Sequence, residues 1–350
     1  MTDGVTPKSM VVGDPNFLTR DSIDPSLADA WKGVALPRSL SRETREIADH
    51  FAYEVTDVDE VNGHSSSPSA ALRENFIELG GVTACVCEWG PKDGPAILCL
   101  HGILDQGGLW GKVARELVQR GFRVIAPDLR GHGRSEHASP DSVYQMLDFV
   151  VDVDALVRHL DVRFEVVVGH SMGAVIAGLL AVARPELARK LVLIEPPVLR
   201  EAREEDNGEI LRAYLNYAGS VPSHPVFPSL SVASTRISTV LSSLSQQECD
   251  DLALRITQEV EGGVTWIWDP RLKTRSGPLF ESFSSGSTAV KNFAKHIALP
   301  TTIVLGSDSE IKDQENVFDH ALQAVDKVTV EGGHHAHLDS LDQVAKIVGL

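Results

Sequence analysis

The feature that most constrains the fold is a repeated alternation of short apolar runs with longer amphipathic segments. The runs consist mainly of Val, Ile and Leu and predict strands at 96–100, 122–126, 164–168, 191–194, 302–305 and 327–330. Helices are predicted between and after them, at 109–119, 141–160, 172–183, 313–324 and 338–348. Strands that are apolar throughout and joined by helices form a parallel sheet covered on both faces. Right-handed crossovers then favour a doubly wound topology.

Two further strands precede this alternation. Residues 76–79 and 82–89 flank Gly80-Gly81, a dipeptide typical of a tight hairpin. The sequence therefore predicts an α/β protein with an eight-stranded, mostly parallel sheet.

Two segments stand apart from this core, which we assign to residues 73–196 and 298–350. Residues 1–72 end in a linker-like stretch, Asn62–Ala70, and are expected to form a partly disordered N-terminal extension. Residues 197–297 interrupt the alternation and are predicted to form a helical cap subdomain. Because ligands collect at the carboxyl ends of parallel strands, a lid function is expected for this insertion.

Composition narrows the classes of partner. With 32 Lys and Arg against 49 Asp and Glu, the net charge of −17 disfavours nucleic acid and anionic lipid. The sequence contains no run of 18 apolar residues, so no membrane span is predicted. It has no basic N-terminal segment followed by an apolar run, so no secretory signal is predicted. The four cysteines are too few and scattered for a disulfide framework. We expect buried thiols in a cytoplasmic protein without a metal or other cofactor.

The candidate nucleophile is Ser171, in the motif Gly169-His-Ser-Met-Gly173. The motif joins a predicted strand to a predicted helix, the context in which a G-x-S-x-G turn presents its serine hydroxyl. A serine needs a base, and three histidines follow the last predicted strand. His334 comes directly after a glycine pair and is the candidate base, whereas His335 is expected to be solvated and His337 to be structural.

Two carboxylates are candidates for the group that orients the imidazole. Glu195 ends one predicted strand and Asp308 follows the next, and either gives the order serine, acid, histidine. An oxyanion hole requires two backbone N–H groups. Met172, after the nucleophile, and Ile103, in the loop after the strand 96–100, are the candidates.

Four motifs together resemble the α/β-hydrolase superfamily. They are His101-Gly102, the segment Ala126–Ser135, the segment Gly169–Ala174 and Gly332-Gly-His334. The resemblance implies acyl transfer to water through a covalent acyl-enzyme. The superfamily commonly places its acid in the pattern G-x-x-D after the penultimate strand, but here the third residue after Gly306 is Ser309.

Some polyketide-releasing thioesterases place the acid one strand earlier, where Glu195 stands, and we therefore favour Glu195 over Asp308. The chain is similar to these thioesterases, and to serine-hydrolase-like proteins, in further places. The resemblance implies substrate contacts from Leu104 in the loop 101–106 and from Trp266, Trp268, Arg271 and Arg275 in the insertion. An arginine there would hold an anionic group of the substrate.

The resulting expectation is a serine hydrolase acting on an ester or thioester of a mostly apolar acyl chain. The expected partner is a small-molecule acyl substrate, which an acyl carrier could deliver. A carbon–carbon bond hydrolase or a cofactor-free haloperoxidase would use a similar set of residues. A non-catalytic binding protein on the same fold is the alternative from another class. Serine at position 171 disfavours the relatives that use an aspartate nucleophile.

Overall fold

The computed structural model describes residues 71–197, 223–273, 292–312 and 325–349, together with 208, 212, 314, 318 and 319. All of these residues belong to one structural unit, residues 67–350. The extension expected over residues 1–72 lies outside the described residues except for its last two positions. The helix predicted at 313–324 also lies almost wholly outside them. No described helix is both long enough and apolar enough to span a membrane.

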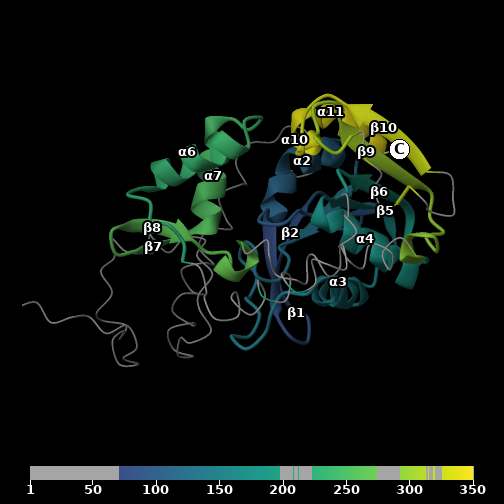
Figure 1. Ribbon diagram of the computed structural model, residues 1–350. Helices are drawn as coiled ribbons and strands as arrows, with labels where there is room; N and C mark the ends of the chain where they lie inside the picture. The colour runs from purple at the N-terminus through teal and green to yellow at the C-terminus, as the bar shows by residue number, and fades with distance from the viewer. Residues whose placement is uncertain are drawn as a thin grey trace, which may run out of the picture. The chain divides into compact units, whose positions relative to one another are not determined.

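Eight strands form the central sheet (Figure 1). They are β1 (Arg73–Glu78), β2 (Thr83–Trp89), β3 (Ala96–Leu100), β4 (Arg123–Pro127), β5 (Phe164–His170), β6 (Ala188–Ile194), β9 (Thr301–Gly306) and β10 (Val325–Val330). Their spatial order is β1-β2-β4-β3-β5-β6-β9-β10. Strand β2 is antiparallel to both of its neighbours, β1 and β4, and all other neighbours are parallel. The predicted eight-stranded, mostly parallel sheet is confirmed.

Helices cover both faces of the sheet. On one face lie α3 (Met146–Leu160) and α4 (Met172–Ala183). On the other face lie α2 (Gly111–Gln119) and α11 (Leu341–Val348). The short helices η2 (Gly107–Trp110) and α10 (Ala336–Asp339) precede α2 and α11. Helix α3 begins five residues later than predicted. Gln145 and Asp148 form a capping box that fixes its start.

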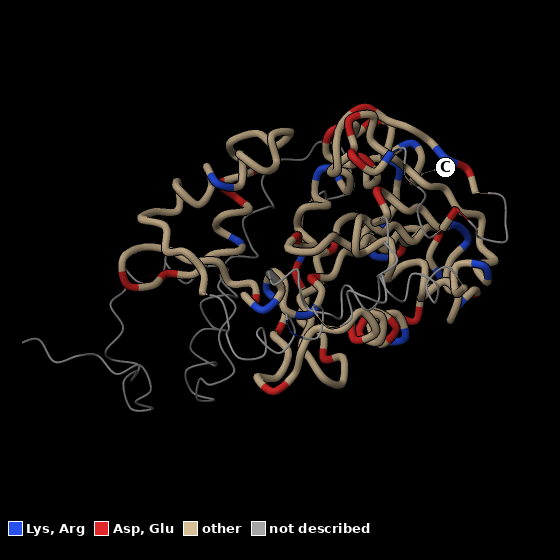
Figure 2. The backbone as a smooth tube through the Cα atoms, viewed as in Figure 1, with Lys and Arg blue, Asp and Glu red and all other residues tan. Residues whose placement is uncertain are grey.

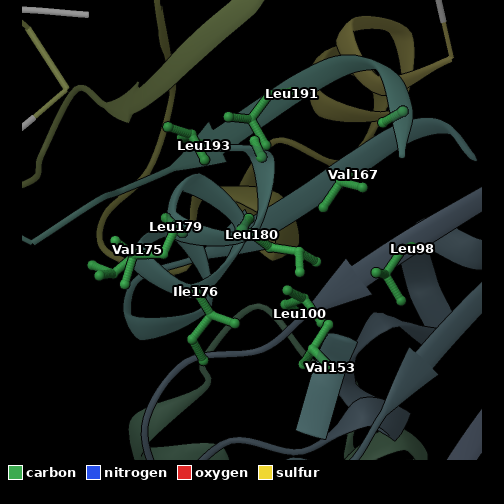
Figure 3. Close-up of a cluster of buried hydrophobic side chains, with 14 of the residues drawn as sticks. Leu98, Leu100, Val153, Val167, Val175, Ile176, Leu179, Leu180, Leu191 and Leu193 are labelled. Atoms are coloured by element: carbon green, nitrogen blue, oxygen red, sulfur yellow. The ribbon is translucent and has the colours of Figure 1, made fainter. Parts of the chain in front are cut away.

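Each central strand contributes to two hydrophobic layers. In β3, Leu98 and Leu100 pack with α3 and α4 (Figure 3), whereas Ile97 and Cys99 pack in the cluster that includes α2 and α11. All four are fully buried. Because successive strand residues point to opposite faces, a strand covered on both sides is apolar at every position. This burial explains the continuous apolar runs of the sequence.

The described part of the insertion between β6 and β9 has a hydrophobic cluster of its own. Its elements are α6 (Leu230–Val240), α7 (Gln246–Ile256), the hairpin of β7 (Thr257–Val260) and β8 (Gly263–Trp266), and the short η4 (Pro270–Lys273). Helices α6 and α7 begin at Ser229 and Ser245, whose side chains accept hydrogen bonds from the first helical turn. The buried residues of the cluster are Ala233, Ile237, Cys249 and Ala253.

Charged residues of both signs are interspersed along the described backbone (Figure 2), but one cation is buried. Arg255, at the end of α7, is only 9% exposed and donates to Asp128 after β4 and to Glu74 in β1, each at 2.8 Å. It also lies 3.1 Å from the sulfur of Cys87. Burial lowers the pKa of Arg255, but Asp128, Cys87 and Glu74 together outweigh it and hold this pKa well above its usual value. Arg255 thus fastens the insertion to the core.

We expect Arg255→Met to lower the free energy of unfolding by about 3–5 kcal/mol, because the fully buried carboxylate of Asp128 would lose its counter-charge. Urea denaturation followed by circular dichroism measures this loss. Arg158→Met is the control, since Arg158 is 63% exposed and pairs with Asp154 on the surface. Removal of such a pair changes stability by about 1 kcal/mol or less. Equal stability of the two variants would contradict the buried role of Arg255.

Candidate active site

Ser171 lies at the sharp turn between β5 and α4. Its backbone adopts φ 51° and ψ −117°, in the positive-φ region that non-glycine residues seldom adopt. Its N–H donates to the carbonyl of Ile194 at 2.9 Å, which ties the turn to β6. Such a conformation costs about 1–3 kcal/mol and persists only where the surrounding structure enforces it. The turn therefore has the geometry expected of a nucleophile elbow.

The two glycines of the motif are required by close backbone contacts. A Cβ on Gly169 would lie 2.3 Å from the carbonyl oxygen of Gly173, and a Cβ on Gly173 would lie 2.3 Å from that of Leu100. Both distances are far shorter than a nonbonded contact allows. Any side chain at either position would force β5, α4 and β3 apart.

Glu195 follows β6 and points toward the loop that holds His334. Its side chain is fully buried, and its Oε2 lies 3.3 Å from His334 Nδ1. The carboxylate also accepts hydrogen bonds from the Gly306 N–H at 2.7 Å and the Ser309 hydroxyl at 2.5 Å. The Asp308 carboxylate instead accepts from the Ser307 hydroxyl at 3.1 Å. Of the two candidate acids, the structure thus brings Glu195 to His334.

His334 lies on the loop between β10 and α10. Its imidazole is half exposed, and the contact of Nδ1 with Glu195 leaves Nε2 as the nitrogen available to accept a proton. Its backbone carbonyl accepts a hydrogen bond from His170 Nε2 at 2.7 Å, and the two rings are 4.9 Å apart between centroids. Since His170 directly precedes Ser171, this bond holds the His334 loop against the elbow.

The loop after β3 runs past Ser171. His101 anchors it, because its Nδ1–H donates to the Gly102 carbonyl at 2.7 Å and its Nε2 accepts from the Leu129 N–H at 2.9 Å. A Cβ on Gly102 would lie 3.2 Å from the Cβ of Ser171, so glycine permits this close approach. Ile103 follows in the same loop. Their positions beside the elbow keep the N–H groups of Ile103 and Met172 as candidates for an oxyanion hole.

Beside the elbow lies a cluster of polar side chains in which His170 is buried and Asp105 and His335 are partly exposed. Asp105 Oδ2 is 3.2 Å from His170 Nδ1, and Asp105 Oδ1 is 3.3 Å from His335 Nε2. The ligand atoms of these three residues all lie within 4.8 Å of one another, so the group could also hold a metal ion. The expectation that His335 is solvated is wrong, because its side chain is only 21% exposed and is bound to Asp105. His337 is buried and stacks on Trp110 at 4.7 Å, as a structural residue does.

The ionisation of the cluster follows from burial and from its hydrogen bonds. Burial raises the pKa of Asp105, but hydrogen bonds from His170 and His335 outweigh it and bring this pKa well below its usual value. Burial lowers the pKa of His335, but its hydrogen bond to Asp105 and the charges of nearby carboxylates together outweigh burial and raise it. For His170, burial prevails over the same bond and lowers the pKa. Burial also brings the pKa of His337 well below its usual value.

A cavity of about 860 Å³ opens beside His334. One wall comes from the loop after α6 in the insertion and the other from the segments after β9 and β10. The described lining residues are Val240, Leu241, Ser242, Ser243, Ser307, Asp308, Glu331, Gly332, Gly333, His334, His335, Leu338 and Asp339. The insertion and the candidate base therefore share one cavity.

Three of the residues expected to contact substrate do not line this cavity in the described structure. Leu104 is 40% exposed, Trp266 packs on Phe227 in the cluster of the insertion, and Trp268 packs against the main core. None of the three is among the described residues that line the cavity. Arg275 lies outside the described residues.

Arg271 is committed to structural contacts rather than to a substrate anion. Its guanidinium donates to the carboxylate of Asp269 through Nε and Nη2. It also donates to the backbone carbonyls of Ala138, Ser139 and Ser142. Together these bonds use all five N–H groups of the guanidinium. The expected role of Arg271 in binding an anion is therefore not supported in this arrangement.

Asp105, His170 and Ser309 are partners within the site that were not predicted from the sequence. His170 lies inside the Gly169–Ala174 motif and Asp105 lies in the loop 101–106, so their nearness to the motif residues was the available signal. Ser309 lies at the position where the superfamily pattern would place its acid, and its hydroxyl instead binds the carboxylate of Glu195. No sequence pattern indicated that Arg255 is almost fully covered, since a single arginine on an amphipathic helix is ordinarily exposed.

The chain matches a protein family and is similar to several known proteins. Residues 95–341 match the model of the alpha/beta hydrolase fold. Serine hydrolase-like protein 2 of Homo sapiens is 29% identical over 283 residues, which cover 74% of this chain and 87% of that protein. A serine hydrolase-like protein of Danio rerio is 26% identical over 275 residues, covering 74% and 82%.

A solved structure resembles the chain over a similar extent. The thioesterase domain from the curacin biosynthetic pathway superposes with a TM-score of 0.73 and is 37% identical. The match covers 79% of this chain and 99% of that domain. The described core is thus that of an α/β-hydrolase similar to thioesterases and to serine-hydrolase-like proteins.

Proposed function

Because this chain belongs to the α/β-hydrolase fold family, we propose that it is a serine hydrolase that cleaves an ester or a thioester through a covalent acyl-enzyme. The observation that carries the proposal is the 3.3 Å contact between Glu195 and His334. The strained turn at Ser171 adds to it, because the His334 loop is bound to the residue before this serine. A serine, a histidine and a buried acid are the set needed for nucleophilic acyl transfer.

The proposed reaction has two steps. The hydroxyl oxygen of Ser171 attacks the acyl carbon while His334 Nε2 accepts the hydroxyl proton. The N–H groups of Ile103 and Met172 stabilise the negative charge on the carbonyl oxygen. Collapse of this intermediate breaks the bond to the alcohol or thiol, which leaves with the proton from His334. Water then attacks the acyl-enzyme by the same route and releases the acid and free Ser171.

Glu195 orients His334 and stabilises its cation in this scheme. Its carboxylate accepts from Nδ1–H, so Nε2 of the neutral imidazole keeps its lone pair for the serine proton. The Ser309 hydroxyl donates to Oε2, the oxygen that also faces His334, and the Gly306 N–H donates to Oε1. These two bonds hold the carboxylate in one orientation.

Within this class we favour a thioester, delivered by an acyl carrier, over an oxygen ester. The support is the 37% identity to a thioesterase domain that is matched over 99% of its length. Kinetics with N-acetylcysteamine thioesters and with p-nitrophenyl esters of the same acyl groups compare the two classes. A higher kcat/KM for the oxygen esters at every chain length would reject the thioester preference.

Labelling by a fluorophosphonate tests the serine mechanism directly. The reagent phosphonylates an activated serine, so mass spectrometry of peptides should place one adduct on Ser171. Labelling should disappear in Ser171→Ala and persist in Ser229→Ala, which changes only the cap of α6. A wild-type protein that remains unlabelled would reject the serine mechanism and favour the non-catalytic alternative.

The charge of the cavity gives a prediction about the acyl group. Asp308, Glu331 and Asp339 line it, and its described lining includes no Lys or Arg. We therefore expect p-nitrophenyl butyrate to be hydrolysed at least about tenfold faster than p-nitrophenyl hemisuccinate, because a carboxylate placed near like charges loses about 1.4 kcal/mol or more. The values of kcat/KM for the two esters measure the preference. Faster hydrolysis of the hemisuccinate would instead support an anion site, for which Arg275 is the remaining candidate.

A further inference from the structure

Asp105 lies where three loops of the candidate site meet. It belongs to the loop after β3, which carries the candidate oxyanion donor Ile103. One carboxylate oxygen contacts His170 at 3.2 Å, on the nucleophile elbow, and the other contacts His335 at 3.3 Å, next to the candidate base. A single side chain thus joins the loops that supply the oxyanion donor, the nucleophile and the base.

The hydrogen bonds of His170 determine where its protons lie. Nε2 is 2.7 Å from the His334 carbonyl, which only accepts, so Nε2 carries a proton. Nδ1 faces Asp105 Oδ2, and an ionised carboxylate also only accepts. A second proton must therefore lie between Nδ1 and Oδ2, because two lone pairs would otherwise face each other at 3.2 Å. Asp105 fixes the ring orientation in which Nε2–H binds the His334 backbone.

The surroundings make His170 unable to use water instead. Its side chain is 1% exposed. Its ring is packed against the rings of His334, His335 and His337, with centroid distances of 4.9, 4.9 and 4.5 Å. The titratable groups that face His170 are thus Asp105 and these imidazoles.

We propose that Asp105 is a positioning residue that holds Ser171, His334 and the oxyanion loop in register through its hydrogen bonds to His170 and His335. The inference rests on the proposed serine mechanism and deepens it. Asp105 touches neither the substrate nor the reacting atoms. It acts on the rate because the distance from Ser171 to the base depends on the bond between His170 and the His334 carbonyl.

Substitutions at position 105 separate hydrogen bonding from charge. In Asp105→Asn, the amide N–H can donate to Nδ1 of a neutral His170, which keeps Nε2–H for the His334 carbonyl, and the amide oxygen can accept from His335. Asp105→Glu retains the charge but moves the oxygens by one methylene. Asp105→Ala removes both bonds. Positioning by hydrogen bonds therefore predicts that the Asn variant is the most active of the three.

Two measurements test this order in the full-length protein. The first is the rate constant for labelling by a fluorophosphonate, and the second is kcat and KM for p-nitrophenyl butyrate. Because a misplacement of about 1 Å costs about 100-fold in rate, we expect Asp105→Ala to lower both rate constants by about that factor. We expect KM to change by less than about threefold, since a loss confined to the transition state lowers kcat alone. Asp105→Asn should stay within about tenfold of wild type, with Asp105→Glu below it.

Asp152→Ala is the matched control for loss of a buried carboxylate. Asp152 lies on α3 and binds Arg130 through two contacts of 2.5 Å, and it is bound to neither His170 nor His335. It should lose stability but keep the wild-type labelling rate in the folded protein, as monitored by near-ultraviolet circular dichroism. If Asp105→Ala does not fold, the order of the Asn and Glu variants remains a test.

The outcomes distinguish this inference from the proposed function. An unlabelled wild-type protein rejects the serine mechanism itself. A labelled wild type with Asp105→Ala equally fast, or with Asp105→Asn slower than Asp105→Glu, overturns the positioning role alone. The role is also overturned if the purified protein contains one zinc ion per chain and treatment with a chelator lowers the labelling rate, because a metal ion would then join Asp105, His170 and His335.

Discussion

Replacing Ser171 by alanine is expected to lower kcat for a p-nitrophenyl ester by about a factor of 10⁶, the loss measured when the serine of another catalytic triad is removed. The hydroxyl is the only group at the strained turn that can form the acyl-enzyme. Without it, water must attack directly, and the oxyanion donors alone provide a residual acceleration of about 10³–10⁴ over the uncatalysed reaction.

The measurement compares initial rates of wild type, Ser171→Ala and Ser229→Ala. Ser229 accepts a hydrogen bond at the start of α6, so its loss should cost about 1 kcal/mol of stability with no change in kcat. The fold should survive Ser171→Ala, because alanine is smaller and the turn is enforced by backbone contacts of the flanking glycines. A residual rate in Ser171→Ala above a tenth of wild type would place the nucleophile elsewhere.

The sheet could be predicted from the sequence because burial on both faces requires apolar residues along each strand, and such a run can be recognised locally. Strands such as β3 and β5 are apolar at nearly every position, and all residues of β3 are buried. The hairpin of β1 and β2 could also be predicted from neighbouring residues, since a glycine pair separates two extended segments. The start of α3 was missed because a capping box, rather than the apolar periodicity, fixes it.

The candidate site was less predictable because its contacts join residues far apart in the chain. Ser171 and His334 lie in motifs that can be recognised from the local sequence. Gly169 and Gly173 complete the motif of Ser171 because close backbone contacts leave no room for a side chain there. The partner of His335, in contrast, is Asp105, 230 residues earlier. A histidine in a loop that begins with two glycines looks solvated until the fold places a carboxylate beside it. Such pairings require the three-dimensional arrangement.

The choice between Glu195 and Asp308 shows the same limit and leads to the second large prediction. Both follow neighbouring strands of the sheet, so the order of residues along the chain cannot separate them. We expect Glu195→Gln to lower kcat by about 10⁴, the loss seen when the acid of a serine triad becomes an amide. Glutamine keeps the shape of the side chain, but its amide cannot stabilise the imidazolium and favours the wrong tautomer of His334.

Asp308→Asn is the matched control. The Asp308 carboxylate follows the next strand and is next to Ser309 in the chain, but it is bound to the hydroxyl of Ser307. Its kcat should stay within about threefold of wild type, as expected of a side chain outside the acid–imidazole contact. The reverse pattern, with Asp308→Asn severely impaired and Glu195→Gln active, would transfer the role of the acid to Asp308.

A second-site substitution tests whether the carboxylate, rather than residue 195 as such, is what His334 requires. The Ser309 hydroxyl lies 2.5 Å from Glu195 Oε2, the oxygen that faces His334. An aspartate at position 309 would therefore bring a carboxylate to the same region from β9. Because contacting residues couple by about 0.5–3 kcal/mol, Glu195→Gln with Ser309→Asp should recover about tenfold in kcat over Glu195→Gln alone.

Ser309→Asp in the wild-type background should instead lower kcat, since two buried carboxylates would repel each other and one would take up a proton. Recovery in the double variant and loss in the single one would together establish that the acid acts through its charge at His334 Nδ1.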